Sequence, residues 1–176
     1  MLTRTQYERL IYTLPSRHPS IRLSTLVLAP PGLDVARLTG LVAFGDDCVL
    51  CVYELLNFGQ GIIEAYRYEV SRCRPPFTES PLPEAAEYCR ASYPDKDKLY
   101  WYDSWPHPND PTLASAHPHH RHMPPDIKRH RIPAPALSFI HPNLPFLIEE
   151  IKGDSHAAGL PVVRTQSAIL GIGSKG

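Results

Sequence analysis

The sequence lacks both a long hydrophobic run and an excess of charge of either sign. Lys and Arg together number 18, as do Asp and Glu, so the formal net charge is zero. This balance excludes a protein that coats nucleic acid through its overall charge, although it leaves room for a local basic patch. No run of about 18 apolar residues marks a membrane span, and the N-terminal stretch carries charges at Arg4, Glu8 and Arg9. We therefore expect a cytoplasmic protein without a signal peptide and without a membrane partner.

The sequence also has few cysteines, at positions 48, 51, 73 and 89. Cys48 and Cys51 have C-x-x-C spacing, but no second such pair completes a four-cysteine zinc site. Both lie in the apolar run DDCVLCVYELL, where we expect them to be small buried residues of a strand. Reduced thiols agree with the expected cytoplasmic location.

Short apolar runs rich in β-branched residues predict strands over much of the first half of the chain. Gly, Asp and Asn separate the runs, as in antiparallel strands that are joined by hairpins. Tyr66 and Tyr68 share one face of their strand with Glu64, so this strand is expected to line a cleft. The predicted strands span residues 21–30, 35–44, 48–56, 62–70 and 98–105.

Helical spacing of apolar residues predicts one helix at residues 3–14, a short one at 83–91 and a longer one at 142–152. Capping and helix-ending residues flank the first and the last of these. The expected boundaries are Thr3 or Thr5 and Pro15 for the first helix, and Asn143 and Gly153 for the last.

These elements predict a single α+β domain over residues 1–153. We expect a curved antiparallel sheet of about four to six strands, with flanking N- and C-terminal helices. Residues 154–176 are expected to form a C-terminal tail. The chain is long enough to bury a core without disulfides.

The segment 100–130 combines histidine and proline in an unusual way. It holds six of the nine histidines, and sixteen of the twenty prolines lie after residue 74. Proline cannot donate to a sheet ladder or continue a helix, so a long Pro/His-rich loop is predicted at 103–130, over one face or edge of the sheet. Because loops often carry function, this loop is the first candidate for the site.

Metal binding is one interpretation of the histidines. His117, His119, His120 and His122 lie within six residues, and some of them could bind zinc or another divalent transition ion, with His107 or Asp103 as a further ligand. The spacing H-P-H-H-R-H matches neither H-E-x-x-H nor the zinc deaminase pattern. A purely structural role, in which the imidazoles bond to loop carbonyls, is the alternative for any single histidine.

Acid–base chemistry without a metal is the interpretation that we favour. Two imidazoles can take a proton from the ribose 2′-OH of RNA and give one to the leaving group. His107, His119, His120 and His122 are the candidate catalytic histidines, and His120 and His122 are the predicted base and acid. The predicted groups for phosphate and bases are Tyr66, Tyr68, Tyr102, Arg121, Lys128 and Arg129.

The order of segments along the chain resembles the TumE-like family of small prokaryotic proteins. Five segments carry the resemblance: FGDDCVLCVYE, YRYEV, YWYDSWPH, HPHHRH and PPDIKRHRIPAPALSFIHPNLPFLIEEI, which together cover about residues 20–152. The chain departs from the family pattern at Ser104, where Asn is common, and at Pro108, where a second His is common. The pattern falls on Glu54, Tyr66, Tyr68, Asp103, His107, His119, His120 and His122.

The resemblance implies the toxin of a toxin–antitoxin module, whose cognate antitoxin is often a helix-turn-helix protein. From the residues we predict a ribonuclease without a cofactor, in which Asp103 and Glu54 orient an imidazole and the loop builds the site with the Tyr66/Tyr68 strand. Two alternatives stay open, a metal-dependent hydrolase or nuclease and a non-enzymatic binding protein. The sequence also leaves open a homo-oligomer.

Overall fold

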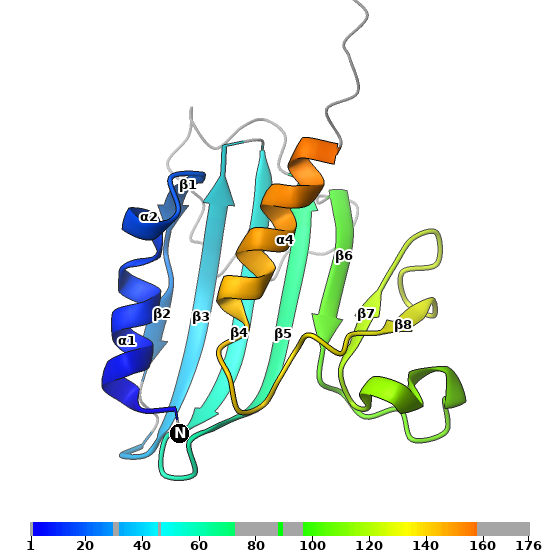
Figure 1. Cartoon of the computed structure of the whole chain (residues 1–176), viewed down its shortest axis with the longest axis horizontal. Coiled ribbons are helices and arrows are strands. Elements are labelled where there is room, and N and C mark those ends of the chain that lie inside the picture. The colour runs from blue at the N-terminus through cyan, green and yellow to red at the C-terminus, as the bar shows by residue number, and fades with distance from the viewer. Residues whose placement is uncertain (1, 30–31, 46, 73–87, 90–96, 158–176) are drawn as a thin grey trace, which may run out of the picture.

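In the computed structural model, which describes residues 2–29, 32–45, 47–72, 88–89 and 97–157, the strands form one antiparallel sheet. The sheet has eight strands in the order β1-β3-β4-β5-β6-β7-β8, and β2 also pairs with β3 (Figure 1). The α+β class agrees with the sequence, but the expected curved sheet of four to six strands is wrong, because the sheet is larger and uncurled. The strands are β1 (Ile21–Ser24), β2 (Val27–Ala29), β3 (Val35–Phe44), β4 (Cys48–Asn57), β5 (Ile62–Arg72), β6 (Asp97–Asp103), β7 (His120–His122) and β8 (Arg131–Pro133). The helices are α1 (Arg4–Tyr12), α2 (Leu14–Arg17), the 3-10 helix η1 (Pro111–Ala116) and α4 (Leu144–Ala157).

The predicted strand 21–30 is divided into β1 and β2 because the chain passes very close to β3 at Gly40. A Cβ at this position would lie 2.4 Å from the carbonyl oxygen of Thr25, and the φ of +135° also favours glycine. Thr25 is bonded to Leu41 through both its backbone N–H and its side chain. The extra strand therefore follows from a local contact that the strand composition does not reveal.

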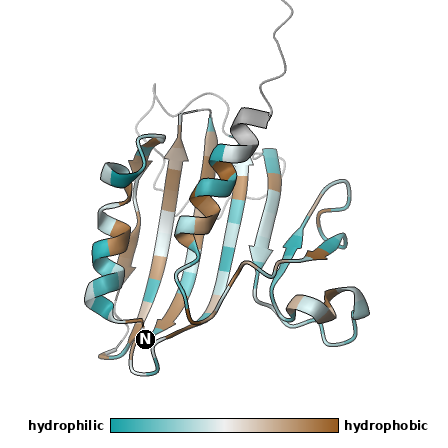
Figure 2. Ribbon diagram, in the orientation of Figure 1, coloured by the Kyte–Doolittle hydropathy of each residue, from teal (hydrophilic) through white to brown (hydrophobic). Residues whose placement is uncertain are grey.

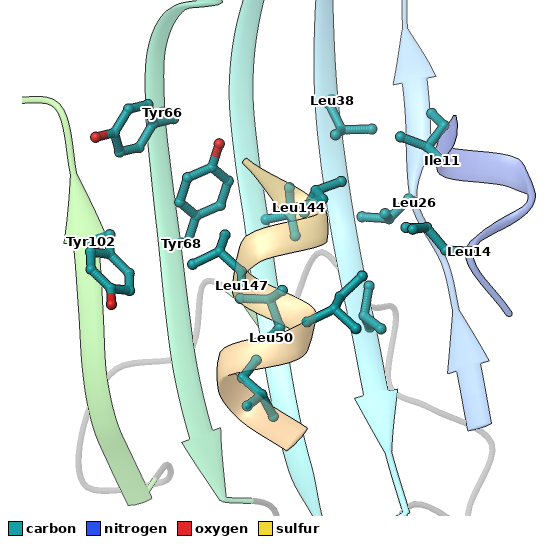
Figure 3. Packing of buried hydrophobic residues seen from close by; sticks show 14 of the residues in the cluster. Ile11, Leu14, Leu26, Leu38, Leu50, Tyr66, Tyr68, Tyr102, Leu144 and Leu147 are labelled. Atoms are coloured by element: carbon teal, nitrogen blue, oxygen red, sulfur yellow. The ribbon is translucent and has the colours of Figure 1, made fainter. Parts of the chain in front are cut away.

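Helices α1 and α4 lie on the same face of the sheet, which we call the helix face (Figure 1). Side chains from this face and from both helices form the main hydrophobic core. Burial of this apolar surface is the main favourable contribution to folding. Figure 3 shows ten of the core residues by name: Ile11, Leu14, Leu26, Leu38, Leu50, Tyr66, Tyr68, Tyr102, Leu144 and Leu147.

The ends of the first helix correct one expectation. Thr3 caps α1 as predicted, since its side chain accepts a hydrogen bond from the backbone N–H of Gln6. Pro15, however, does not follow the helix but lies in the first turn of α2, where its missing N–H costs little. The predicted helix 3–14 therefore corresponds to α1, and a second short helix follows it where the sequence predicted an end.

The C-terminal helix begins where predicted but is capped and ended differently. The Asn143 side chain does not cap α4, because it bonds to the backbone of Ser138 and donates to the hydroxyl of Tyr68 at 2.9 Å. The helix passes through Gly153 and ends at Ala157. Residues 158–176, most of the predicted tail, lie outside the described residues, as does the predicted helix 83–91 apart from residues 88–89.

The Pro/His-rich segment is not one long loop. It contains η1 and strand β7, which pairs with β6 and extends the sheet, and β8 follows directly after it (Figure 1). Figure 2 shows β7 in hydrophilic colours, unlike the largely hydrophobic β2 and β4. A strand of three polar residues has no hydrophobic alternation, so the sequence did not predict it.

The side of the sheet away from the two helices, which we call the opposite face, carries a smaller apolar cluster. Leu41, Val49 and Cys51 belong to this cluster, and Tyr88 and Cys89 pack against it. Cys51 forms a disulfide with Cys89, so the expectation that it is only a small buried residue is incomplete. Cys48 is buried, as expected.

A histidine–aspartate cluster on the opposite face

Strand register brings three predicted site residues together on the opposite face. Asp103 lies opposite His120 in the β6–β7 ladder, and His122 lies opposite Trp101. Because directly paired residues and those two positions apart along a strand share a face, Asp103, His120 and His122 point to the same side. The three-residue strand β7 thus places two histidines of the H-R-H segment beside one aspartate.

The three side chains are in direct contact. The Nε2 atoms of His120 and His122 lie 3.0 Å apart. His120 Nε2 is 3.1 Å from one carboxylate oxygen of Asp103, and His122 Nε2 is 3.3 Å from the other. Both rings are buried, with 0% of His120 and 4% of His122 exposed. Two imidazole nitrogens and two carboxylate oxygens therefore converge on one small volume.

The second nitrogen of each ring is held by the backbone. His120 Nδ1 lies 2.9 Å from the carbonyl oxygen of Pro118, and His122 Nδ1 lies 3.0 Å from that of Ile127. A carbonyl oxygen can only accept a hydrogen bond, so both Nδ1 atoms carry the hydrogen and donate. In the neutral rings each Nε2 is consequently a bare acceptor that points into the cluster.

His107 completes the cluster from the segment that follows β6. Its ring packs edge-on against His120, with centroids 4.8 Å apart. One ligand atom from each of Asp103, His107, His120 and His122 lies within 4.8 Å of the others, so the four could hold a metal ion. We call these four side chains the His/Asp cluster.

Burial, hydrogen bonds and nearby charges shift the pKa values of Asp103, His107 and His120. Burial would raise the pKa of Asp103, but the hydrogen bonds from His120 and His122 outweigh it and hold that pKa well below its usual range. Burial lowers the pKa of His120, yet the hydrogen bond to Asp103 outweighs it and raises the pKa overall. The pKa of His107 is lowered, first by burial and then by the positive charge of Arg131.

Two further residues support the cluster. The indole of Trp101 stacks on the His122 ring, with centroids 4.2 Å apart and planes inclined by 21°. Arg131 lies opposite His122 in the β7–β8 ladder and brings a permanent positive charge to the same face. Its Nε is buried and has no hydrogen-bond partner among the described residues. Trp101 thus fixes one ring, and Arg131 adds a cation beside the cluster.

A groove of about 1090 Å³ begins at Asp103 and extends over the opposite face. Its lining carries charges of both signs, Arg37 and Arg67 against Glu64 and Glu69, and Arg67 forms an ion pair of 3.1 Å with Glu69. Two aromatic side chains of the lining are exposed, Trp105 by 72% and Tyr53 by 39%. Cations and exposed aromatic rings in one groove are the features with which proteins hold single-stranded nucleic acid.

Glu54, Tyr66 and Tyr68 are not brought to the His/Asp cluster. Glu54 is paired with Tyr66 on the helix face. The neighbouring pair, Tyr53 and Arg67, lies on the opposite face, where Arg67 is in turn paired with Asp103. The Glu54 carboxylate is buried and accepts hydrogen bonds from Tyr7 of α1 and from Tyr68. Burial raises its pKa from 4.5 to about 7 against the opposing effect of these two bonds. The structure therefore gives Glu54 and Tyr68 contacts that join α1 to the sheet.

His119 and Arg121 also point to the helix face. His119 Nδ1 lies 2.6 Å from the Tyr66 hydroxyl. Arg121 forms an ion pair of 3.0 Å with Glu150 of α4, and its guanidinium lies over the Tyr100 ring at 3.6 Å. Tyr102 donates to the same Glu150. These contacts hold β7 against the helix.

The other predicted residues lie apart from the cluster. His117 is exposed at the end of η1, and Lys128 and Arg129 are exposed in the turn between β7 and β8. None of the three lines the groove. The predicted metal ligands His117 and His119 are thus not members of the His/Asp cluster, and Asp103 and His107 take their places.

Sequence reasoning missed the groove residues Arg67 and Trp105 and the cluster neighbour Trp101. Arg67 could have been found from strand parity, because it alternates with Tyr66 and Tyr68 and therefore faces away from them. The place of Trp101 beside His122 requires the β6–β7 register, which the sequence did not predict.

The fold and the site define a small α+β protein with a His/Asp cluster beside a groove of mixed charge with exposed aromatic residues. A family model described as Toxin TumE matches residues 14–155. The chain belongs to this toxin family. Neither curated proteins nor solved structures gave a significant match.

In the described part of the chain, no helix is both long and apolar enough to cross a membrane.

Proposed function

We propose that this toxin acts by cleaving RNA at the His/Asp cluster. The observation that carries the proposal is the contact of His120 and His122 with the Asp103 carboxylate, which lies at the end of a groove with exposed aromatic residues and with both arginine and glutamate in its lining. A proton-accepting centre beside a surface suited to single-stranded nucleic acid supports RNA as the substrate. The wider function, toxin of a toxin–antitoxin module, follows from the family.

In the proposed reaction the ribose 2′-OH attacks the adjacent phosphorus. The hydroxyl proton passes to the cluster, the O2′–P bond forms and the P–O5′ bond breaks. The leaving 5′-oxygen takes up a proton, which leaves a 2′,3′-cyclic phosphate and a 5′-hydroxyl. His120 and His122 are the proposed base and acid, and Asp103 stabilises the positive charge on the imidazole that holds the proton.

The groove supplies RNA binding in this proposal. Arg67 lies on the same face as Asp103, directly opposite it in the β5–β6 ladder. Its guanidinium can contact a phosphate near the cluster, while Trp105 and Tyr53 can stack on bases. Arg131 is placed on the far side of the cluster and can neutralise charge on the scissile phosphate.

The cognate antitoxin is the partner that a toxin of this kind requires. We propose that it carries a helix-turn-helix domain, as the family resemblance implies, and that it blocks the groove. Size-exclusion chromatography of the two purified chains, separately and mixed, tests whether the toxin forms a homo-oligomer and whether it binds the antitoxin.

Cleavage of a labelled RNA by the purified full-length protein tests the function. The matched substrate carries a single 2′-deoxy sugar at the cleavage position, which removes the nucleophile. We expect cleavage of the all-ribose RNA, a cyclic phosphate product and no cleavage at the deoxy position. Equal cleavage at the deoxy position would exclude the 2′-OH mechanism, and no cleavage together with undiminished growth inhibition would favour a non-enzymatic toxin.

A further inference from the structure

We propose that Asp103, His107, His120 and His122 bind a divalent first-row transition ion between them. The proposal shares its residues with the proposed RNA cleavage and rests on that function only for the role of the ion in catalysis. The binding itself is argued from the geometry of the four side chains.

Hydrogen-bond acceptors of His120, His122 and Asp103 converge in the cluster. The Nδ1 hydrogens of His120 and His122 are committed to carbonyl oxygens at 2.9 and 3.0 Å. Both Nε2 lone pairs then face each other at 3.0 Å and face the two oxygens of Asp103. With both rings neutral and no cation between them, two bare nitrogens and a carboxylate would face one another in a buried place, which is unfavourable. A cation at their centre converts the repulsion into attraction.

The second argument is that the support of the rings matches that of metal ligands in general. A ligating histidine almost always donates its second ring N–H to a carbonyl or carboxylate, which fixes the tautomer and aims the free nitrogen at the ion. His120 and His122 both show this feature. Stacking on Trp101 further restrains the His122 ring. Rings fixed in this way have already lost the freedom that binding would otherwise remove.

The donor set indicates the class of ion. Three imidazole nitrogens and one carboxylate oxygen suit zinc, cobalt, nickel, manganese or ferrous iron, whereas Mg²⁺ and Ca²⁺ prefer oxygen ligands throughout. The ligand atoms lie within 4.8 Å of one another, so modest side-chain adjustment brings all four to one centre. His120 and His122 would then be ligands, and solvent held by the ion would take over the acid–base role at the 2′-OH.

The competing explanation is a single proton. An imidazolium at His120, bonded to Asp103 and to His122 Nε2, would also satisfy these atoms. The two explanations differ in what the protein retains on purification and in how many side chains matter, since a shared proton does not require His107.

Metal analysis of the full-length protein, purified without a polyhistidine tag and without chelator, distinguishes them. We expect about one equivalent of a first-row transition metal per chain, and a melting temperature that falls after chelator treatment and recovers with Zn²⁺ or Co²⁺. Titration of the metal-free protein with Co²⁺ should give the visible absorption of a cobalt ion with nitrogen ligands. The readouts contain no RNA, so their failure and the failure of the proposed cleavage can be told apart.

Variants assign the ligands. Asp103→Asn and His107→Ala should each lower Co²⁺ affinity more than about 100-fold, which is the upper end of the loss on removing a supporting residue. His107 is only partly buried, so its variant is expected to keep the fold even if that of His122 does not. His117→Ala and His141→Ala, both exposed outside the cluster, are the matched controls and should bind Co²⁺ unchanged. Absence of bound metal and of any Co²⁺ spectrum, or equal binding by all four variants, would overturn the proposal.

Discussion

Glu54 and Asp103 lie on opposite faces of one sheet, two strands apart. Glu54 is enclosed beneath the helices with Tyr7 and Tyr68, whereas Asp103 contacts His120 and His122 at the groove. The two carboxylates, which the sequence places in one site, therefore have separable roles. Variants of Glu54 should change the stability of the protein, and variants of Asp103 should change its activity.

Asp103→Asn should abolish most activity while the protein stays folded. The change keeps the size of the side chain but removes the negative charge that both His120 and His122 contact. We expect the rate of RNA cleavage to fall about 100-fold or more, in the range typical of a lost acid–base group. Cleavage rate and circular dichroism measured on the same preparation check this, and unchanged cleavage would remove Asp103 from the site.

Stability should depend on pH through Glu54. Its folded pKa of about 7 lies above the ordinary 4.5, so the folded state keeps the proton that the unfolded state releases between these values. The free energy of unfolding should therefore fall as pH rises from about 4.5 to 7, by on the order of 3 kcal/mol at about 1.4 kcal/mol per pH unit.

Urea unfolding of the wild type and of Glu54→Gln at several pH values measures this effect. The variant should lose the slope between pH 4.5 and 7, because a neutral amide has no proton to release. Glu64→Gln, at an exposed position, is the control and should keep the slope. An identical slope in all three proteins would show that Glu54 ionises normally in the folded state.

RNA affinity should depend on the groove and not on the turn between β7 and β8. Trp105→Ala removes a largely exposed ring, and loss of one base-stacking contact should weaken RNA binding about tenfold. Tyr12→Ala, an exposed aromatic of α1 that does not line the groove, should bind normally. Fluorescence anisotropy with a short single-stranded RNA gives both dissociation constants.

Arg67 provides the corresponding test for charge. Arg67→Ala should weaken binding and reduce its salt dependence, because a phosphate contact in the groove is lost. The double variant Lys128→Ala/Arg129→Ala tests the two residues that the sequence analysis predicted to bind phosphate. A larger loss in the double variant than in Arg67→Ala would place the RNA on the turn instead.

Arg121 should matter for stability and not for RNA binding. Its guanidinium is paired with Glu150 and packed over Tyr100, so truncation to Ala should cost about 1–3 kcal/mol in the free energy of unfolding. Arg129→Ala, at an exposed position, should cost little. Weakened RNA affinity in Arg121→Ala at unchanged stability would restore its predicted role as a phosphate ligand.

The strands that build the fold could be predicted because their apolar runs are long and their turns are marked. β3 covers the predicted residues 35–44, and β4 and β5 begin where expected. What could not be predicted is which face each site residue occupies. One strand of three polar residues, β7, decides that His120 and His122 join Asp103 while Arg121 and His119 turn to the helix face.

The site was therefore predicted in its residue types and only partly in its membership. Alternation within the H-H-R-H segment divides neighbouring residues between the two faces, so nearness in sequence grouped His117 and His119 with His120 and His122, although neither belongs to the His/Asp cluster. Asp103 and His107 enter the cluster through pairing of β6 with β7 and the path that follows β6, both of which depend on contacts distant in sequence.

We propose that the His/Asp cluster is the reacting centre of an RNA-cleaving toxin. The most direct measurement compares cleavage of one labelled RNA by wild type, Asp103→Asn, His120→Ala and Glu54→Gln, at a pH and temperature where each variant is folded. We expect the two cluster variants to lose cleavage and Glu54→Gln to keep it. Full cleavage by both cluster variants, or loss only in Glu54→Gln, would show that RNA is not cleaved at the cluster.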